Sequence, residues 1–113
     1  MPPPTHRQCL SVRMAKAART TARLTAVRRH IDRLDEQLLK LINKRARFAL
    51  EIGHIKKRRK WPVFDAGREA FVLRHMVQAN PGPLSAAAVG HIFQAILCEC
   101  RRRERRHSKP GKM

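Results

Sequence analysis

The sequence predicts an all-α protein whose chain forms three helices, long, short and medium in that order, and pairs with a second copy into an intertwined homodimer. The composition favours helices, because Ala, Leu, Arg and Lys are abundant while the 113 residues include no Tyr, one Trp and five Gly. Apolar residues also recur in alternating steps of three and four between Leu24 and Ile55, with no intervening Pro. A chain of this length suits one small domain, near the size at which oligomerisation often completes the burial of a core.

The first helix carries a regular apolar seam on one face. We expect this helix to begin between Ala15 and Leu24 and to end near Lys57, with only Gly53 as an interruption. The seam has ten positions, nine of them apolar: Leu24, Val27, Ile31, Leu34, Leu38, Leu41, Arg45, Phe48, Ile52 and Ile55. At about 1.5 Å per residue the seam is roughly 47 Å long, which exceeds the width of a compact domain of this size. Two short helices of the same chain cannot cover it, so the sequence predicts that a second copy does.

The second and third helices are marked by their caps. A Trp-Pro pair at positions 61 and 62 ends the first helix, because the residue before a proline avoids the helical conformation. Asp65 can cap a second helix from about Ala66 to Ala79. After a break rich in Pro and Gly, Ser85 can cap a third helix that runs to about Arg106. The predicted inward faces are Val72, Leu73, Met76 and Val77 on the second helix, and Val89, Ile92, Phe93, Ile96, Leu97 and Cys100 on the third.

The net charge of +18 is concentrated at the two ends of the chain. Residues 1–31 hold seven Lys or Arg and no acid, and residues 101–113 hold seven against Glu104 alone. We therefore expect a basic, flexible N-terminal extension over residues 1–20, a helical domain over residues 21–106 and a basic C-terminal tail over residues 107–113. Such ends predict weak, non-specific attraction to nucleic acid.

The cysteines and the hydropathy predict a cytoplasmic protein. Cys9, Cys98 and Cys100 give an odd count without the spacing of a disulfide framework, which fits a reducing compartment. No apolar run approaches the length of a membrane span or resembles a secretory signal, so we expect no membrane association. An organellar transit peptide and initiation at Met14 stay open as alternatives. The six histidines lack ligand spacing, and we expect no metal and no cofactor.

Two charged residues of the first helix occupy its apolar face. Arg45 stands in the seam itself, and Lys56 follows eleven residues later, which is close to three full turns. Charged groups at such positions are costly unless they meet a partner or a ligand. Arg28 lies seventeen residues before Arg45, roughly 100° around the helix, so it could serve the same site only from the other chain. The alternatives are that Arg45 forms an ion pair with Glu99 or Glu104 that fixes the dimer register, and that Lys56 only complements the helix dipole.

The other two helices supply acids and a further arginine. Cys100 and Glu104 continue the apolar stripe of the third helix, while Arg68 and Glu69 lie in the first turn of the second helix beside Asp65. The predicted pocket combines Arg28 of one chain with residues of the other: Arg45, Lys56, Arg68, Glu69 and Glu104. Such a pocket is mainly cationic but also contains two acidic side chains. This combination suits a small ligand that carries two carboxylates and a hydroxyl.

Three segments of the chain resemble the all-helical chorismate mutase family. They are AVRRHIDRLDEQLLKLINKRARFALEIGHIKK, PVFDAGREAFVL and GPLSAAAVGHIFQAIL, and the resemblance covers about Val27 to Glu104. It rests on the combined spacing of two arginines, a lysine eleven residues after the second, an aspartate and an Arg-Glu pair. The resemblance implies an intertwined dimer with two sites and no cofactor.

The resemblance also implies roles for individual side chains. Arg28 from the other subunit and Arg45 would hold the carboxylates of the substrate. Lys56 would contact a carboxylate and the ether oxygen, and Glu104 would donate to that oxygen from the opposite side. The remaining residues would bind or support the substrate: the backbone near Asp65 and the carboxylate of Glu69 at the ring hydroxyl, Arg68 beside the acids, and Cys100 where a serine often assists a carboxylate.

The implied function is the rearrangement of chorismate to prephenate in the biosynthesis of phenylalanine and tyrosine. This intramolecular [3,3] reaction needs no nucleophile or metal, only a compact substrate conformer and stabilisation of charge on the ether oxygen, for which Arg45, Lys56 and Glu104 are the catalytic candidates. The position of Glu104 is commonly a glutamine, and an ionised carboxylate cannot donate a hydrogen bond, so Glu104 must carry a proton to help. Two alternatives stay open: an isochorismate-pyruvate lyase on the same scaffold, and a basic helical protein that binds nucleic acid or assembles.

Overall fold

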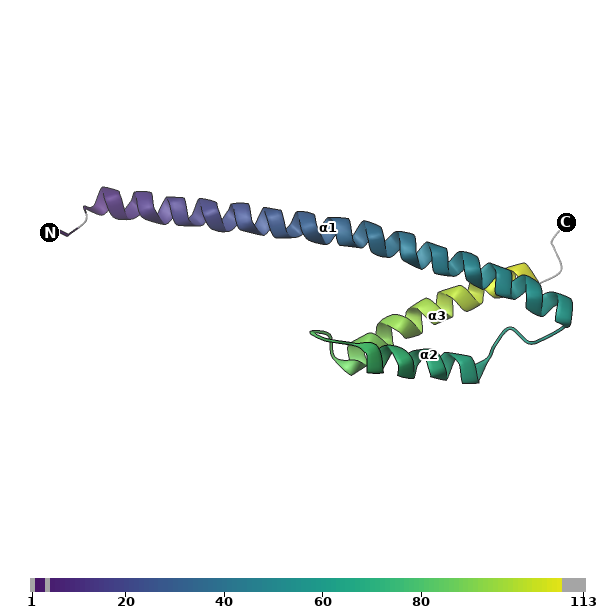
Figure 1. The fold of residues 1–113 in the computed structure, drawn as a ribbon. Helices are drawn as coiled ribbons and strands as arrows, with labels where there is room; N and C mark the ends of the chain where they lie inside the picture. Colours follow the sequence, from purple (N-terminus) through teal and green to yellow (C-terminus); the bar gives the residue numbers. More distant parts are fainter. Residues whose placement is uncertain (1, 4, 109–113) are drawn as a thin grey trace. The chain divides into compact units, whose positions relative to one another are not determined.

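The described residues form three α-helices, in the order that the sequence predicted. The structure is a computed structural model that describes residues 2, 3 and 5–108. Helix α1 spans His6–Arg59, α2 spans Ala66–Ala79 and α3 spans Ala86–Ser108 (Figure 1). No strand occurs among the described residues, so the all-α class is confirmed. The last five residues of the predicted C-terminal tail lie outside the described part of the chain.

Helix α1 begins earlier than the sequence predicted. Our expected start between Ala15 and Leu24 was wrong, because the helix begins at His6 and includes most of the predicted N-terminal extension. The backbone amide of Gln8 donates to Thr5 Oγ1 at 3.3 Å, and the amide of Thr5 donates to Gln8 Oε1 at 2.8 Å. This reciprocal pair is a capping box, and the alanines that follow it favour helix. The scattered charges of this segment give it a poor amphipathic stripe, so hydrophobic periodicity alone does not predict this part of the helix.

Helix α1 ends in a Schellman motif at Lys60. The amide of Trp61 donates to the carbonyl of Lys56 at 2.9 Å, and the amide of Lys60 donates to the carbonyl of Lys57 at 3.2 Å. Lys60 has a φ of 57°, the left-handed conformation that this motif requires. Four basic residues in the last turn complement the negative end of the helix dipole: Lys56, Lys57, Arg58 and Arg59.

Replacing Lys60 with glycine is expected to stabilise the protein by about 0.5–1 kcal/mol, because glycine takes a positive φ without the steric cost of a Cβ. Thermal unfolding followed by circular dichroism should show a midpoint raised by roughly 2–8 °C for a domain of this size. Lys57→Gly is the matched control, since Lys57 lies inside the helix and glycine should lower the midpoint there. An unchanged midpoint for Lys60→Gly would contradict this account of the helix end.

The chain divides into two units, Met1–Lys40 and Leu41–Met113. Every described residue of the first unit is exposed in the single chain, including the first half of the apolar seam. The seam side chains of this unit are between 45% and 56% exposed: Leu24, Val27, Ile31, Leu34 and Leu38. A helix with such a row of apolar side chains is usually covered by another helix.

The second unit contains a small core where α2 and α3 lie side by side (Figure 1). Its buried apolar side chains are Ala49, Val72, Val89, Leu97 and Cys100. The caps that the sequence predicted are confirmed: Asp65 Oδ1 accepts from the amide of Arg68 at 3.0 Å, and Ser85 Oγ accepts from the amide of Ala88 at 3.1 Å. Val77 and Ile92 were assigned to the inward faces, but they are 36% and 46% exposed in the single chain. Among the described helices we find no stretch that is both long and apolar enough to cross a membrane.

Candidate active site

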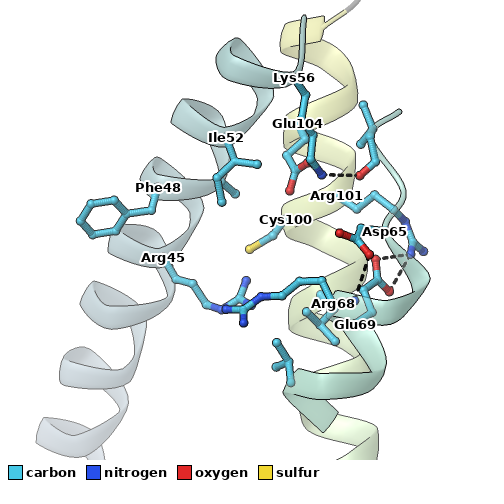
Figure 2. Close-up of a pocket in the computed structure, with 14 residues that line it drawn as sticks. Arg45, Phe48, Ile52, Lys56, Asp65, Arg68, Glu69, Cys100, Arg101 and Glu104 are labelled. Carbon is cyan, nitrogen blue, oxygen red and sulfur yellow. Dashed lines mark hydrogen bonds and ion pairs between the residues drawn. The ribbon is translucent and has the colours of Figure 1, made fainter. Parts of the chain in front are cut away.

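The second unit holds a cavity of about 420 Å³ between the C-terminal half of α1, the loop before α2, and helices α2 and α3 (Figure 2). Its lining is partly apolar and partly charged: Arg45, Phe48, Ala49, Ile52, Lys56, Val63, Asp65, Arg68, Glu69, Val72, Leu97, Cys100, Arg101 and Glu104. The predicted site residues of this unit all line the cavity. Arg28 belongs to the first unit and is not among the lining residues.

One face of α1 supplies the cavity with both of its unusual cations. Arg45, Ile52 and Lys56 project from α1 toward α3 at steps of seven and four residues, whereas the ring of Phe48 points away from α3 (Figure 2). The helical period therefore does place Arg45 and Lys56 at one cavity, as the spacing predicted. Of the apolar side chains between them, Ala49 is buried, while Phe48 and Ile52 are 54% and 44% exposed in the single chain.

Lys56 connects three elements of the second unit. Its Nζ atom donates to the carbonyl oxygen of Val63 at 2.6 Å and lies 3.1 Å from Glu104 Oε2. The side chains of Lys56 and Glu104 are only 17% and 13% exposed. An ammonium has three donors, so one remains for a ligand after these two contacts. Lys56 therefore does more than complement the helix dipole.

Arg101 is a cavity residue that the sequence analysis missed. Its Nη1 atom donates to Glu69 Oε1 at 2.8 Å and to Glu69 Oε2 at 2.7 Å. Its guanidinium carbon lies 4.9 Å from the centre of the Phe64 ring, a cation–π distance. In the sequence Arg101 stands at the start of a basic run, which hides its place in the cavity. The signal that could have found it is its spacing of four and eight residues from Leu97 and Phe93, on the inward stripe of α3.

Two arginines of the cavity have no acidic partner among the described residues. Arg45 and Arg68 extend into the cavity from α1 and α2 and point toward one another (Figure 2). In the described part of the chain, the ion pairs join other side chains: Lys56 with Glu104, Arg101 with Glu69, and Arg102 with Glu99. Glu99 and Glu104, the acids considered as partners of Arg45, are thus engaged elsewhere in this chain. Two guanidiniums that face one another repel, and an anionic ligand between them would relieve that repulsion.

Asp65 and Cys100 are the remaining predicted residues in the wall of the cavity. Asp65 lines the cavity while it caps α2, and Cys100 is 5% exposed with its sulfur directed toward the cavity (Figure 2). Within the described part of the chain, no group of three His, Cys, Asp or Glu side chains could hold a metal ion. The cavity thus offers two guanidiniums that no described acid engages, one partly used ammonium and three carboxylates.

Comparison with known proteins identifies relatives of the chain. The model of the family described as chorismate mutase type II matches residues 27–105. The bifunctional chorismate mutase/prephenate dehydratase of Pseudomonas aeruginosa is 43% identical over 82 residues, which cover 68% of this chain and 22% of the relative. That of Aquifex aeolicus is 33% identical over 81 residues, again 68% of this chain and 22% of the relative. The chain thus spans about a fifth of the length of these curated relatives.

A solved structure is similar over most of both chains. Form II of the chorismate mutase of Thermus thermophilus superimposes with a TM-score of 0.74 at 29% sequence identity. The match covers 77% of this chain and 99% of that chain.

Proposed function

Because the chain belongs to the chorismate mutase type II family, as its sequence predicted, we propose that it rearranges chorismate to prephenate. One observation carries the proposal. The guanidiniums of Arg45 and Arg68 pair with no described acid, whereas the other two cations of the cavity, Lys56 and Arg101, form ion pairs. Chorismate is a dicarboxylate, and guanidiniums bind carboxylates through charge-assisted, forked hydrogen bonds. The product serves the biosynthesis of phenylalanine and tyrosine, and the cytoplasmic location of this activity stays a prediction.

The reaction breaks the carbon–oxygen bond of the ether and forms a carbon–carbon bond within one molecule. The protein must therefore hold a compact conformer and stabilise the negative charge that develops on the ether oxygen. In the proposed mechanism this oxygen lies between Lys56 and Glu104, so substrate entry separates the two side chains that are 3.1 Å apart in the free site. The carbonyl of Val63 keeps Lys56 in place during this change.

The proposed enzyme is an intertwined homodimer in which Arg28 reaches the partner's cavity. The half of the seam in the first unit supports this assembly, because its five apolar side chains are all at least 45% exposed in the single chain. A second copy that packs on this face would bury them and bring a further cation to each site. Weak attraction of the basic segments to nucleic acid stays a prediction that salt titration can test.

The function is tested by incubating the purified protein with chorismate and measuring chorismate loss and prephenate formation by chromatography. Stoichiometric conversion is expected without any added metal or cofactor. If chorismate is untouched while isochorismate releases pyruvate, the lyase replaces the mutase. If neither compound reacts and the protein binds DNA with strong salt dependence, the proposal fails in favour of a binding protein.

Gly53 sets the distance between α1 and the backbone of Glu104. A Cβ at position 53 would lie 3.2 Å from both the Cα atom and the carbonyl oxygen of Glu104, closer than packed atoms normally approach. Gly53→Ala is expected to reduce turnover about three- to tenfold, because Glu104 must shift by a few tenths of an ångström. The matched control is Gly90→Ala, since a Cβ on Gly90 meets no atom within 4 Å. Equal turnover in the two variants would show that the close approach has no catalytic consequence.

A further inference from the structure

We propose that Arg101 is a positioning residue for the proposed reaction: it holds Glu69 as an ionised acceptor for the ring hydroxyl of the substrate and keeps that carboxylate away from Arg45 and Arg68. The inference rests on the proposed function and deepens it. It assigns a role to a cavity residue that the family resemblance did not single out.

Arg101 is fixed between two elements that border the cavity. Its Nη1 atom contacts both carboxylate oxygens of Glu69 at 2.8 and 2.7 Å, and Phe64 in the loop before α2 covers the guanidinium at 4.9 Å. The side chains of Arg101 and Glu69 are 25% and 19% exposed, so water screens this pair only in part. A planar guanidinium held in this way leaves the carboxylate few orientations.

The contact fixes Glu69 without exhausting its capacity to accept hydrogen bonds. Each carboxylate oxygen has two lone pairs, and Arg101 uses one on each oxygen. The remaining lone pairs can accept the proton of a hydroxyl. A ligand with a hydroxyl should therefore bind more tightly than one without it. Without the hydroxyl, the partly buried carboxylate would lose solvation by water and gain no hydrogen bond in return.

The contact also keeps the guanidiniums of Arg45 and Arg68 available. Glu69 lines the same cavity as Arg68 and Arg45, so a Glu69 carboxylate released from Arg101 would be drawn to these two guanidiniums. It would then compete with the carboxylates of the substrate for the same donors. Arg101 prevents this competition, since it already neutralises Glu69 from the opposite helix.

The experiment compares Arg101→Gln with its matched control Arg102→Gln on the full-length protein. Arg102 is also on α3 and also pairs with an acid, Glu99, but both of those side chains are more than 65% exposed and outside the cavity. We expect Arg101→Gln to raise KM for chorismate about tenfold or more with a smaller change in kcat, and Arg102→Gln to stay within about twofold of the unmodified protein. Arg101→Lys retains the charge without the planar group and should give an intermediate KM.

A double-mutant cycle with Glu69→Gln separates positioning from simple structural support. If Arg101 acts through Glu69, Arg101→Gln should change KM by less than about twofold when Glu69→Gln is already present. An undiminished penalty in that background would overturn the proposal, and so would an Arg101→Gln variant that matches Arg102→Gln. If circular dichroism shows that Arg101→Gln does not fold, Arg101→Lys replaces it in the same double-mutant cycle. Absence of turnover by the unmodified protein is a separate result, which overturns the proposed function and this inference together.

Discussion

Replacing Arg45 with alanine is expected to lower kcat/KM for chorismate by about a hundredfold to a thousandfold. Arg45 is half-buried in the cavity, has no acidic partner among the residues that the structure describes and faces Arg68. In the proposed mechanism its loss leaves one carboxylate of the substrate without its cation, a change that typically costs about 2–5 kcal/mol. Steady-state kinetics on the purified variant measure the effect. Arg47→Ala is the matched control, because Arg47 is exposed on the same helix and does not line the cavity.

The Arg45→Ala variant can also show whether each site contains residues of two chains. If Arg28 acts from the partner, Arg28→Ala should be inactive alone, and mixing it with Arg45→Ala after unfolding and refolding should restore activity. Random pairing makes half of the dimers mixed, and each mixed dimer has one intact site, so about a quarter of the unmodified activity should return. No recovery despite confirmed subunit exchange would contradict the shared site. If the Arg45→Ala variant retains activity, Arg45 does not bind the substrate, and the alternative that it fixes the dimer register is favoured.

The helical period and the caps made much of this site predictable. Because 11 residues are close to three full turns, the positions of Arg45 and Lys56 on one face followed from counting alone. Asp65 and Ser85 were found because a short polar side chain before a helical pattern has a specific partner, the free amide three residues later. The family and the all-α class that rested on these features are confirmed.

The features that escaped prediction depend on tertiary contacts or were hidden by composition. The carbonyl of Val63 holds Lys56 only because the loop before α2 returns to α1, a path that no local pattern encodes. Arg101 was obscured because arginines surround it, so its place on the inward stripe of α3 did not stand out from the charge. The early start of α1 depends on a pair of reciprocal hydrogen bonds between Thr5 and Gln8. The net charge of the segment gives no indication of this capping box.

The rate of the proposed reaction is expected to fall as the pH rises, and Glu104→Gln is expected to abolish this dependence. Glu104 lies 3.1 Å from Lys56 with its side chain 13% exposed, so it is placed beside the group that would contact the ether oxygen. Only the protonated carboxyl can donate a hydrogen bond to that oxygen, whereas the ionised form repels the charge that develops there. Loss of that proton removes the donor and adds a repelling charge, so kcat of the unmodified protein should decline toward high pH.

The amide of glutamine donates a hydrogen bond at every pH, so the Glu104→Gln variant should hold a flat kcat across the range in which the unmodified protein declines. Glu104→Ala is the control, because it removes donor and charge together and should be slow at all pH values. Thermal unfolding of each variant at the extremes of the range separates loss of catalysis from loss of fold. A decline that persists unchanged in Glu104→Gln would show that Glu104 is not the cause of the pH dependence.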